Sequence, residues 1–262
     1  MLRSVPRWAD LGSAVAAVEQ WILPGECLLC HGAVGGFFAD SLICGPCRNR
    51  WTPLPLPICT RCGQPLTPGI ACRTCIAWPD ALSGVSSVFW LDAGARRAVH
   101  LLKYGGWWRV SEAMARGMHR LAAIPRGSTL VPIPLGPTRL RTRGYNQSAV
   151  LAAALGKLVQ IPVADMVLQR RRETTSQTAL TPEERRANLS GAFAAAGPVP
   201  LCPVLVDDVF TTGATLAEAA AALLAAGAAT VGGITFARAP RPLADAAAAL
   251  HLASDTSLGR RE

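Results

Sequence analysis

The sequence has no apolar run long enough to cross a membrane. No stretch of eighteen uninterrupted apolar residues occurs among its 262 residues. The longest candidate, from Leu216 to Val231, is interrupted by Glu218 and Gly227, whereas a membrane-spanning helix needs about 20 predominantly apolar residues. We therefore expect no membrane insertion.

The first twenty residues also lack the features of an export signal. Their apolar part is short, Asp10 and Glu19 interrupt it, and no convincing cleavage site follows. The cytoplasm is therefore the expected location.

Acidic residues are scarce relative to basic ones. The chain has 17 Asp and Glu against 26 Lys and Arg, a net charge of +9. Much of the excess positive charge lies in residues 131–190, which contain nine basic and four acidic residues, a net charge of +5. Polyanionic substrates explain such a segment, and nucleic acid is the alternative explanation.

Cysteine is abundant, and its spacing predicts metal sites. Eight of the nine cysteines form four CxxC pairs before residue 80. Two such pairs place four thiolates around one tetrahedral zinc ion, so eight make two structural sites with no open position. The expected ligands are Cys27, Cys30, Cys44 and Cys47 for one zinc, and Cys59, Cys62, Cys72 and Cys75 for the other, although a crossed pairing is also possible.

The alternatives to zinc are a disulfide framework, which a chain without an export signal disfavours, and an iron–sulfur centre, which usually needs a third cysteine nearby. His31 follows a ligand cysteine and is not expected to bind the metal.

Little in this region could form an apolar core, so metal should supply its folding energy. We expect residues 1–80 to form an amino-terminal helix (10–22) and a double zinc-ribbon module.

One stretch, VLVDDVFTTGATL at residues 204–216, organises the rest of the chain. Its branched apolar start predicts a buried central strand that two carboxylates end. A loop of small and hydroxylated residues then opens an Ala-rich helix that Gly227 is expected to stop. Free backbone amides and the helix dipole at such a start favour an anion.

A phosphate fits this loop, and vicinal sugar hydroxyls suit the paired acceptors, so the stretch predicts a ribose 5-phosphate site. The alternative is an acidic turn followed by a Thr N-cap. The residues expected to bind the ribose are Asp207 and Asp208, and those expected to bind the 5-phosphate are Thr211, Thr212, Gly213, Ala214 and Thr215.

This stretch resembles the phosphoribosyl pyrophosphate (PRPP) signature of type I phosphoribosyltransferases, and every position of the pattern is filled. The resemblance implies a central, mainly parallel sheet flanked by helices over residues 81–262. It also implies PRPP as a ligand, with Mg²⁺.

A second anion site is expected upstream, where an apolar strand (129–134) runs into prolines and is followed by a loop with three arginines. The sequence GYNQ at 144–147 then opens a helix that is expected to end at about Val159. Several charge-assisted donors suit pyrophosphate, and a solvated basic loop is the alternative. The candidates are Arg139, Arg141, Arg143 and, at a helix end, Lys103, which could instead be only a helix C-terminal cation. Trp107 and Trp108 are expected to be packing or rim residues.

A long polar segment at 170–181 could close over a bound substrate, or be an ordinary surface loop. Further strands are expected at 85–91, 163–168 and 230–236, and helices at 95–104, 111–123, from 182 and at 243–250, while Cys202 is expected in the core. The loop residues of interest are Arg172, Thr175 and Gln177.

Taken together, the zinc module, VPIPL, RLRTRGYNQ and VLVDDVFTTGAT resemble the ComF family over nearly the whole chain. The resemblance implies an association with DNA uptake in natural transformation and a helicase partner of the ComF-operon type. A polar segment also matches, at Arg172, Thr175, Gln177, Leu180, Arg186, Asn188 and Phe193.

Two classes of function follow. One is an enzyme that transfers phosphoribosyl from PRPP to an acceptor. No motif in the sequence identifies that acceptor, and the reaction needs no side chain as a nucleophile. The other is a PRPP or nucleotide sensor, or an accessory protein that handles single-stranded DNA, because the fold alone does not decide the reaction. For DNA, we expect the zinc module rather than the PRPP cleft to be the platform.

Overall fold

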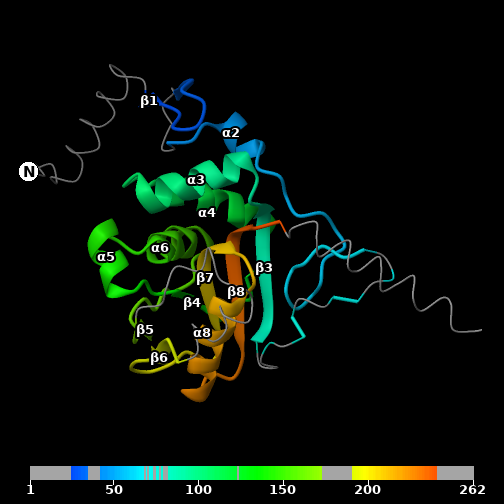
Figure 1. The fold of residues 1–262 in the computed structure, drawn as a ribbon, viewed down its shortest axis with the longest axis vertical. Helices are drawn as coiled ribbons and strands as arrows, with labels where there is room; N and C mark the ends of the chain where they lie inside the picture. Colours follow the sequence, from blue (N-terminus) through cyan, green and yellow to red (C-terminus); the bar gives the residue numbers. More distant parts are fainter. Residues whose placement is uncertain are drawn as a thin grey trace, which may run out of the picture.

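The computed structural model describes residues 25–34, 42–67, 69, 71, 72, 75, 76, 78, 82–122, 124–172 and 191–240. They form an α/β fold in which helices flank a parallel sheet, with a cysteine-rich region before it (Figure 1). After the cysteine-rich region, the helices and strands in chain order are β3 Leu82–Trp90, α3 Ala93–Tyr104, α4 Val110–Leu121, β4 Thr129–Pro132, α5 Pro137–Arg143, α6 Gln147–Val159, β5 Leu168–Arg170, β6 Phe193–Ala195, β7 Pro203–Phe210, α8 Ala214–Ala225 and β8 Val231–Arg238.

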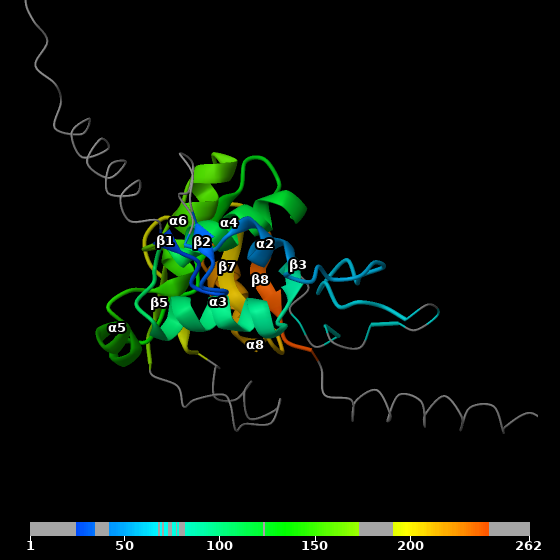
Figure 2. The same cartoon turned by 90° about the horizontal axis from the view of Figure 1, so that it is seen from above.

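The four-stranded sheet has the order β3-β8-β7-β4, and its strands pair in parallel. The apolar start of the organising stretch therefore lies in β7, a central strand, as expected. Successive side chains of a strand point to opposite faces: Val204 and Val206 join the core under α4 and α6, and Leu205 joins the core under α8. Figures 1 and 2 show these helices covering the sheet, with α3 above the carboxyl ends of its strands.

Three local expectations are wrong. The acidic pair does not end β7, because the strand stays paired with β8 through Val209 and Phe210. The three arginines lie on a short helix, α5, rather than in a loop, since Pro137 suits a first helical turn. The strand expected at 163–168 is reduced to one bridge between Val163 and Leu130, followed by the short β5.

The cysteine-rich region contains β1 Gly25–Glu26, β2 Ala33–Val34 and α2 Gly45–Asn49. The expectation that it contributes little apolar core is also wrong. Trp51 is 2% exposed and packs edge-on against Phe89 and Phe236, with ring centroids 5.5 and 4.9 Å away. The region is therefore joined to the sheet by a shared apolar core.

Cys202 was expected in the core but is exposed, because it precedes β7 at the amino ends of the strands. It lines a hollow of about 340 Å³ there, with Ser128 and Thr230. Ligands of parallel sheets bind at the opposite, carboxyl ends, so we assign this hollow no role.

Some expectations fall outside the described residues. They are the helix at 10–22, the boundary at residues 80 and 81, the loop residues Thr175 and Gln177, the helix from 182 and the helix at 243–250. Among the described residues, no helix combines the length and apolarity needed to span a bilayer.

Candidate functional site

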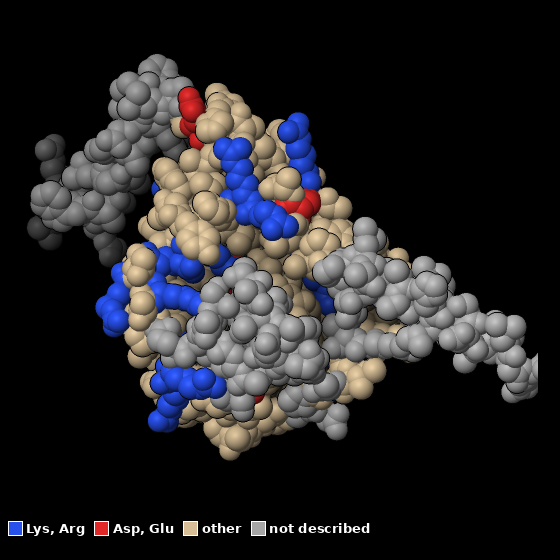
Figure 3. Space-filling view, viewed as in Figure 1, with Lys and Arg blue, Asp and Glu red and all other residues tan. Residues whose placement is uncertain are grey.

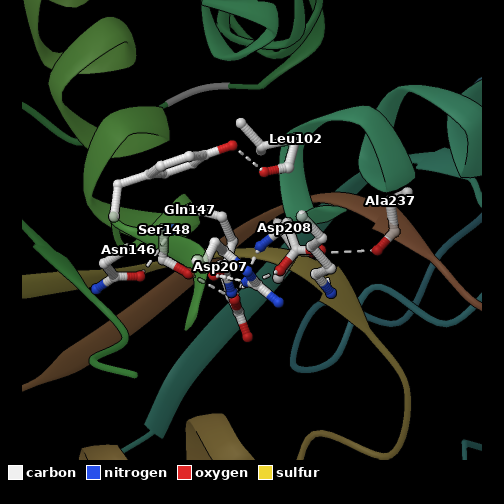
Figure 4. Close-up of polar contacts among 11 residues, drawn as sticks. Leu102, Asn146, Gln147, Ser148, Asp207, Asp208 and Ala237 are labelled. Atoms are coloured by element: carbon white, nitrogen blue, oxygen red, sulfur yellow. Dashed lines mark hydrogen bonds and ion pairs between the residues drawn. The ribbon is translucent and has the colours of Figure 1, made fainter. Parts of the chain in front are cut away.

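The acidic pair of β7 is held by side chains from two helices (Figure 4). Asp207 accepts hydrogen bonds at Oδ1 from the Ser148 hydroxyl, at 2.8 Å, and from the amide of Asp208, at 2.9 Å. Asp208 accepts one from Gln147 Nε2 at 3.3 Å, and its Oδ2 lies 2.5 Å from Lys103 Nζ. Strand β7 and helices α3 and α6 therefore meet at one polar centre.

The start of α6 is fixed by its own capping residues. The Asn146 side chain accepts from the amide of Ser148 at 3.0 Å and donates to the carbonyl of Ile133 at 2.9 Å. An N-cap of this kind satisfies one of the free amides of the first turn. Tyr145 donates its hydroxyl to the carbonyl of Leu102 at 2.5 Å, which ties this turn to α3. Gln147 and Ser148 thus face β7 in a fixed orientation.

Burial and charge set the proton affinities at this centre. Burial, followed by repulsion from Asp208, raises the pKa of the Asp207 carboxyl to about 7, although Lys103 and Ser148 oppose the change. Burial alone would lower the pKa of Lys103, but the carboxylates of Asp208 and Asp207 raise it. The site thus holds a persistent ammonium beside a carboxyl that titrates near neutrality.

Two of the four candidate pyrophosphate residues join this network. Lys103 pairs with Asp208, and Arg143 donates to Gln147 Oε1 while its guanidinium lies 5.3 Å from the Tyr104 ring centroid. Arg141 instead contacts Thr138 within α5, at 3.3 Å. Arg139 is half-buried on the same helix. Arg172 lies two residues after the end of β5.

The TTGAT loop forms the start of α8, as the sequence predicts. Gly213 is the N-cap of α8, with φ of 81°, and has no side chain that could accept from the first-turn amides. Thr212 Oγ1 accepts from the amide of Ala214 at 3.4 Å. Thr211 is exposed, and Thr212 and Thr215 are half-buried. This geometry suits an anion at the helix start.

Sequence reasoning missed the roles of Ser148 and Gln147. Gln147 ends the GYNQ sequence that is expected only to open a helix, and Ser148 follows it directly. Polar residues in the first turn of a helix that follows a buried strand could have marked them, because such a turn faces the carboxyl edge of the sheet.

The eight CxxC cysteines gather in two groups of four, in chain order: Cys27, Cys30, Cys44 and Cys47, then Cys59, Cys62, Cys72 and Cys75. The sulfur atoms of each group lie within 4.8 Å of one another. Tetrahedral zinc with Zn–S bonds of about 2.3 Å places sulfurs about 3.8 Å apart. The distances from Cys30 to Cys44 and from Cys59 to Cys75 are both 3.8 Å. The two groups therefore fit two structural zinc ions.

Backbone amides support the first group. Burial would raise the pKa of the Cys27 thiol, but hydrogen bonds from the backbone, including the amides of Cys44 at 3.3 Å and Leu29 at 3.4 Å, lower it to about 6. Thiolates are the form that binds zinc. The lowered pKa therefore favours the thiolate form of Cys27, which can bind zinc.

Comparison with known proteins agrees with this arrangement. Residues 18–76 match the model of the double zinc ribbon domain family. The DNA utilization protein YhgH of Salmonella typhimurium is 33% identical over 218 residues, which cover 80% of this chain and 95% of the relative. Competence protein F of Haemophilus influenzae is 26% identical over 205 residues, covering 74% and 88%.

The chain belongs to the ComF family. Competence protein ComFC of Bacillus subtilis is similar as well, with 27% identity over 212 residues, covering 76% of this chain and 85% of that protein. These similarities cover 205 to 218 residues and therefore extend well beyond the zinc ribbons matched at residues 18–76.

In this ComF-family chain we expect two zinc ions per molecule. Eight thiolates in two closed groups leave no open position, so both ions should be retained through purification without added metal. Metal analysis of the untagged protein measures this directly. A stoichiometry near zero, with the thiols oxidised, would contradict the assignment.

Proposed function

We propose that the polar centre of β7 and the start of α8 bind PRPP together with Mg²⁺, and that the protein transfers phosphoribosyl from it. The main support for this proposal is that Asp207 and Asp208 contact Lys103 and the first turn of α6 at one place. The names of the relatives support a role of this reaction in DNA utilization or competence.

Different residues of the site would bind different groups of PRPP. The amides at the start of α8 would receive the 5-phosphate, and the half-buried carboxylate of Asp207 would accept from the ribose hydroxyls. Lys103 would keep Asp208 in place and, with Arg143, offset the charge of the pyrophosphate. As C1 loses pyrophosphate it becomes cation-like, so positioning and charge carry the reaction.

Mg²⁺ fits the donors present, because carboxylate oxygens are its preferred protein ligands. Asp207 is the residue that would hold it, since the neighbouring carboxylate of Asp208 is already paired with Lys103. When bound, the ion would offset charge on the pyrophosphate.

PRPP binding with Mg²⁺ should therefore weaken about tenfold or more in Asp207→Asn, because a charge-assisted hydrogen bond contributes about 1.5–3 kcal/mol. Wild-type affinity should also rise as pH increases through about 7, where Asp207 ionises. Calorimetry at pH 6 and pH 8 measures both effects. PRPP itself titrates, so the difference between wild type and Asp207→Asn isolates the contribution of this carboxyl.

The exposed residue Asp165 offers the matched control, since Asp165→Asn makes the same chemical change on the surface. Equal affinities for wild type and Asp207→Asn would refute the assigned role. Stability gives an independent check of the pKa: the unfolded carboxyl ionises near pH 4, so stability should fall as pH rises from about 4 to 7 and Asp207→Asn should reduce that fall.

Turnover separates an enzyme from a sensor. PRPP consumption with a panel of bases and amines would identify a transferase, whereas binding without consumption by any acceptor would indicate the alternative, a non-catalytic PRPP sensor.

Single-stranded DNA is a second candidate ligand, and one surface favours it. Tyr104, at the end of α3, is 70% exposed, and Trp107 and Trp108, between α3 and α4, are 42% and 51% exposed. Arg143 lies over the Tyr104 ring, and Lys and Arg side chains gather over α5 and α3 (Figure 3). Aromatic faces beside basic side chains are typical of proteins that stack single-stranded bases. A helicase partner of the ComF-operon type belongs to this proposal.

DNA bound at this surface should lose affinity steeply with salt, because phosphate contacts release counterions. Trp108→Ala should weaken it by about 1–3 kcal/mol, the usual contribution of one stacked base. A fluorescence titration at two salt concentrations measures both. If chelation of zinc abolishes DNA binding while Trp108→Ala leaves it unchanged, the platform is the zinc module instead.

A further inference from the structure

We propose that the second cysteine group holds the TTGAT loop in its binding conformation, through Trp78 and Arg238 as positioning residues. The inference rests on the proposed function in one respect, namely that this loop receives the ligand phosphate. The second cysteine group then supports the ligand site by fixing its loop, whereas the first cysteine group does not.

The Trp78 indole lies directly on the loop. It is 8% exposed and packs against Phe210 with ring centroids 5.8 Å apart. A Cβ placed on Gly213 would come within 2.3 Å of Trp78 Cζ2. No side chain fits at that distance, and the φ of 81° independently favours glycine. Gly213 is therefore required by the indole above it as well as by the turn.

Trp78 is in turn fixed by the second cysteine group. Its amide donates to the carbonyl of Cys75 at 3.2 Å. Arg61 lies between the two, with Nη1 donating to the Cys75 carbonyl at 3.2 Å and Nη2 to the Trp78 carbonyl at 2.9 Å. A zinc ion that fixes Cys75 would thereby fix the backbone that carries the indole.

Arg238 makes a second connection. It ends β8, is 1% exposed, and donates to the Cys62 carbonyl at 2.7 Å and to Gln64 Oε1 at 3.1 and 2.9 Å. Its guanidinium lies 4.0 Å from the centroid of the Phe210 ring. Phe210 is the last residue of β7 and precedes the loop directly. A buried arginine needs such partners, so Cys62 and Phe210 are held together.

The first cysteine group has different neighbours. Cys27 and Cys47 belong to the core that contains Trp51 and residues of α3, α4 and α6. Cys62, Cys75 and Trp78 belong to the other core, with Phe210 and the buried residues of α8. Loss of the second zinc should therefore loosen the loop, and loss of the first should not.

Hydrogen exchange of the amides at 211–216 tests the connection without any ligand. In the zinc-loaded protein, Trp78→Leu should speed exchange about tenfold, whereas Trp108→Leu, at an exposed position, should not change it. Trp78→Leu should also weaken PRPP binding about tenfold, as is usual when a supporting contact is lost. Trp78→Phe keeps a ring on the loop and should restore both.

Cysteine variants give the second comparison. Cys62→Ser and Cys30→Ser each remove one ligand from one group, and zinc content shows which ion is lost. Only Cys62→Ser should speed exchange at 211–216. Equal exchange in both variants, or unchanged exchange in Trp78→Leu, would overturn the inference. Faster exchange in Trp78→Leu in a protein that does not bind PRPP would keep the connection and refute the proposed function.

Discussion

Lys103→Met is expected to lower the free energy of unfolding by about 3 kcal/mol and to abolish PRPP binding. Asp208 is 2% exposed, and Lys103 Nζ lies 2.5 Å from its Oδ2. Removing one partner of a buried pair leaves the other charge uncompensated, which costs about 3–5 kcal/mol. The Lys103 side chain is 22% exposed, so the lower end of that range applies. Denaturant unfolding measures the stability and calorimetry the binding.

The matched control is Lys157→Met, since Lys157 is exposed on α6. It should change stability by less than about 0.5 kcal/mol. Adding Asp208→Asn to Lys103→Met should recover most of the lost stability without restoring binding, because the buried charge is then gone. A double variant as unstable as Lys103→Met alone would show that the lysine acts through packing rather than charge.

Trp51→Ala should destabilise the protein by about 3–5 kcal/mol, the usual result of truncating a buried tryptophan. Its indole touches Phe89 and Phe236 on two strands, and its Cζ3 would lie 3.1 Å from a Cβ at Gly117 in α4. The cavity would therefore open where the cysteine-rich region, β3, β8 and α4 meet.

Trp108→Ala is the control, because this indole is 51% exposed. It should change the free energy of unfolding by less than about 1 kcal/mol. Thermal unfolding of the zinc-loaded protein compares the two variants. If Trp51→Ala were as stable as Trp108→Ala, the cysteine-rich region would be held to the sheet by something other than this shared core.

Local patterns predicted much of this fold. The branched run before the acidic pair predicted a central strand, and the spacing of the CxxC pairs predicted two closed groups in chain order. Both depend on residues close together in the sequence. The end of α6 near Val159 was also predicted, and its start at Gln147, which Asn146 caps, falls within the GYNQ sequence expected to open it.

Contacts between distant segments could not be predicted in this way. The length of β7 depends on its pairing with β8, which carries Val209 and Phe210 into the sheet. The burial of Asp208 depends on a lysine from α3. The sequence places Gly213 in the expected phosphate loop but does not indicate that Trp78 fills its Cβ direction. A local pattern does not specify which distant side chain fills such a position.

The order of the strands also constrains how the protein is made. β3 and β4 are synthesised first, but they lie at the two edges of the four-stranded sheet and are separated by β8 and β7. They cannot pair with each other, so the parallel sheet has to wait until almost the last described residues have left the ribosome. Such non-local pairing slows folding and leaves apolar strands exposed meanwhile. A chain interrupted before β7 would therefore be an aggregation hazard rather than a partly working protein.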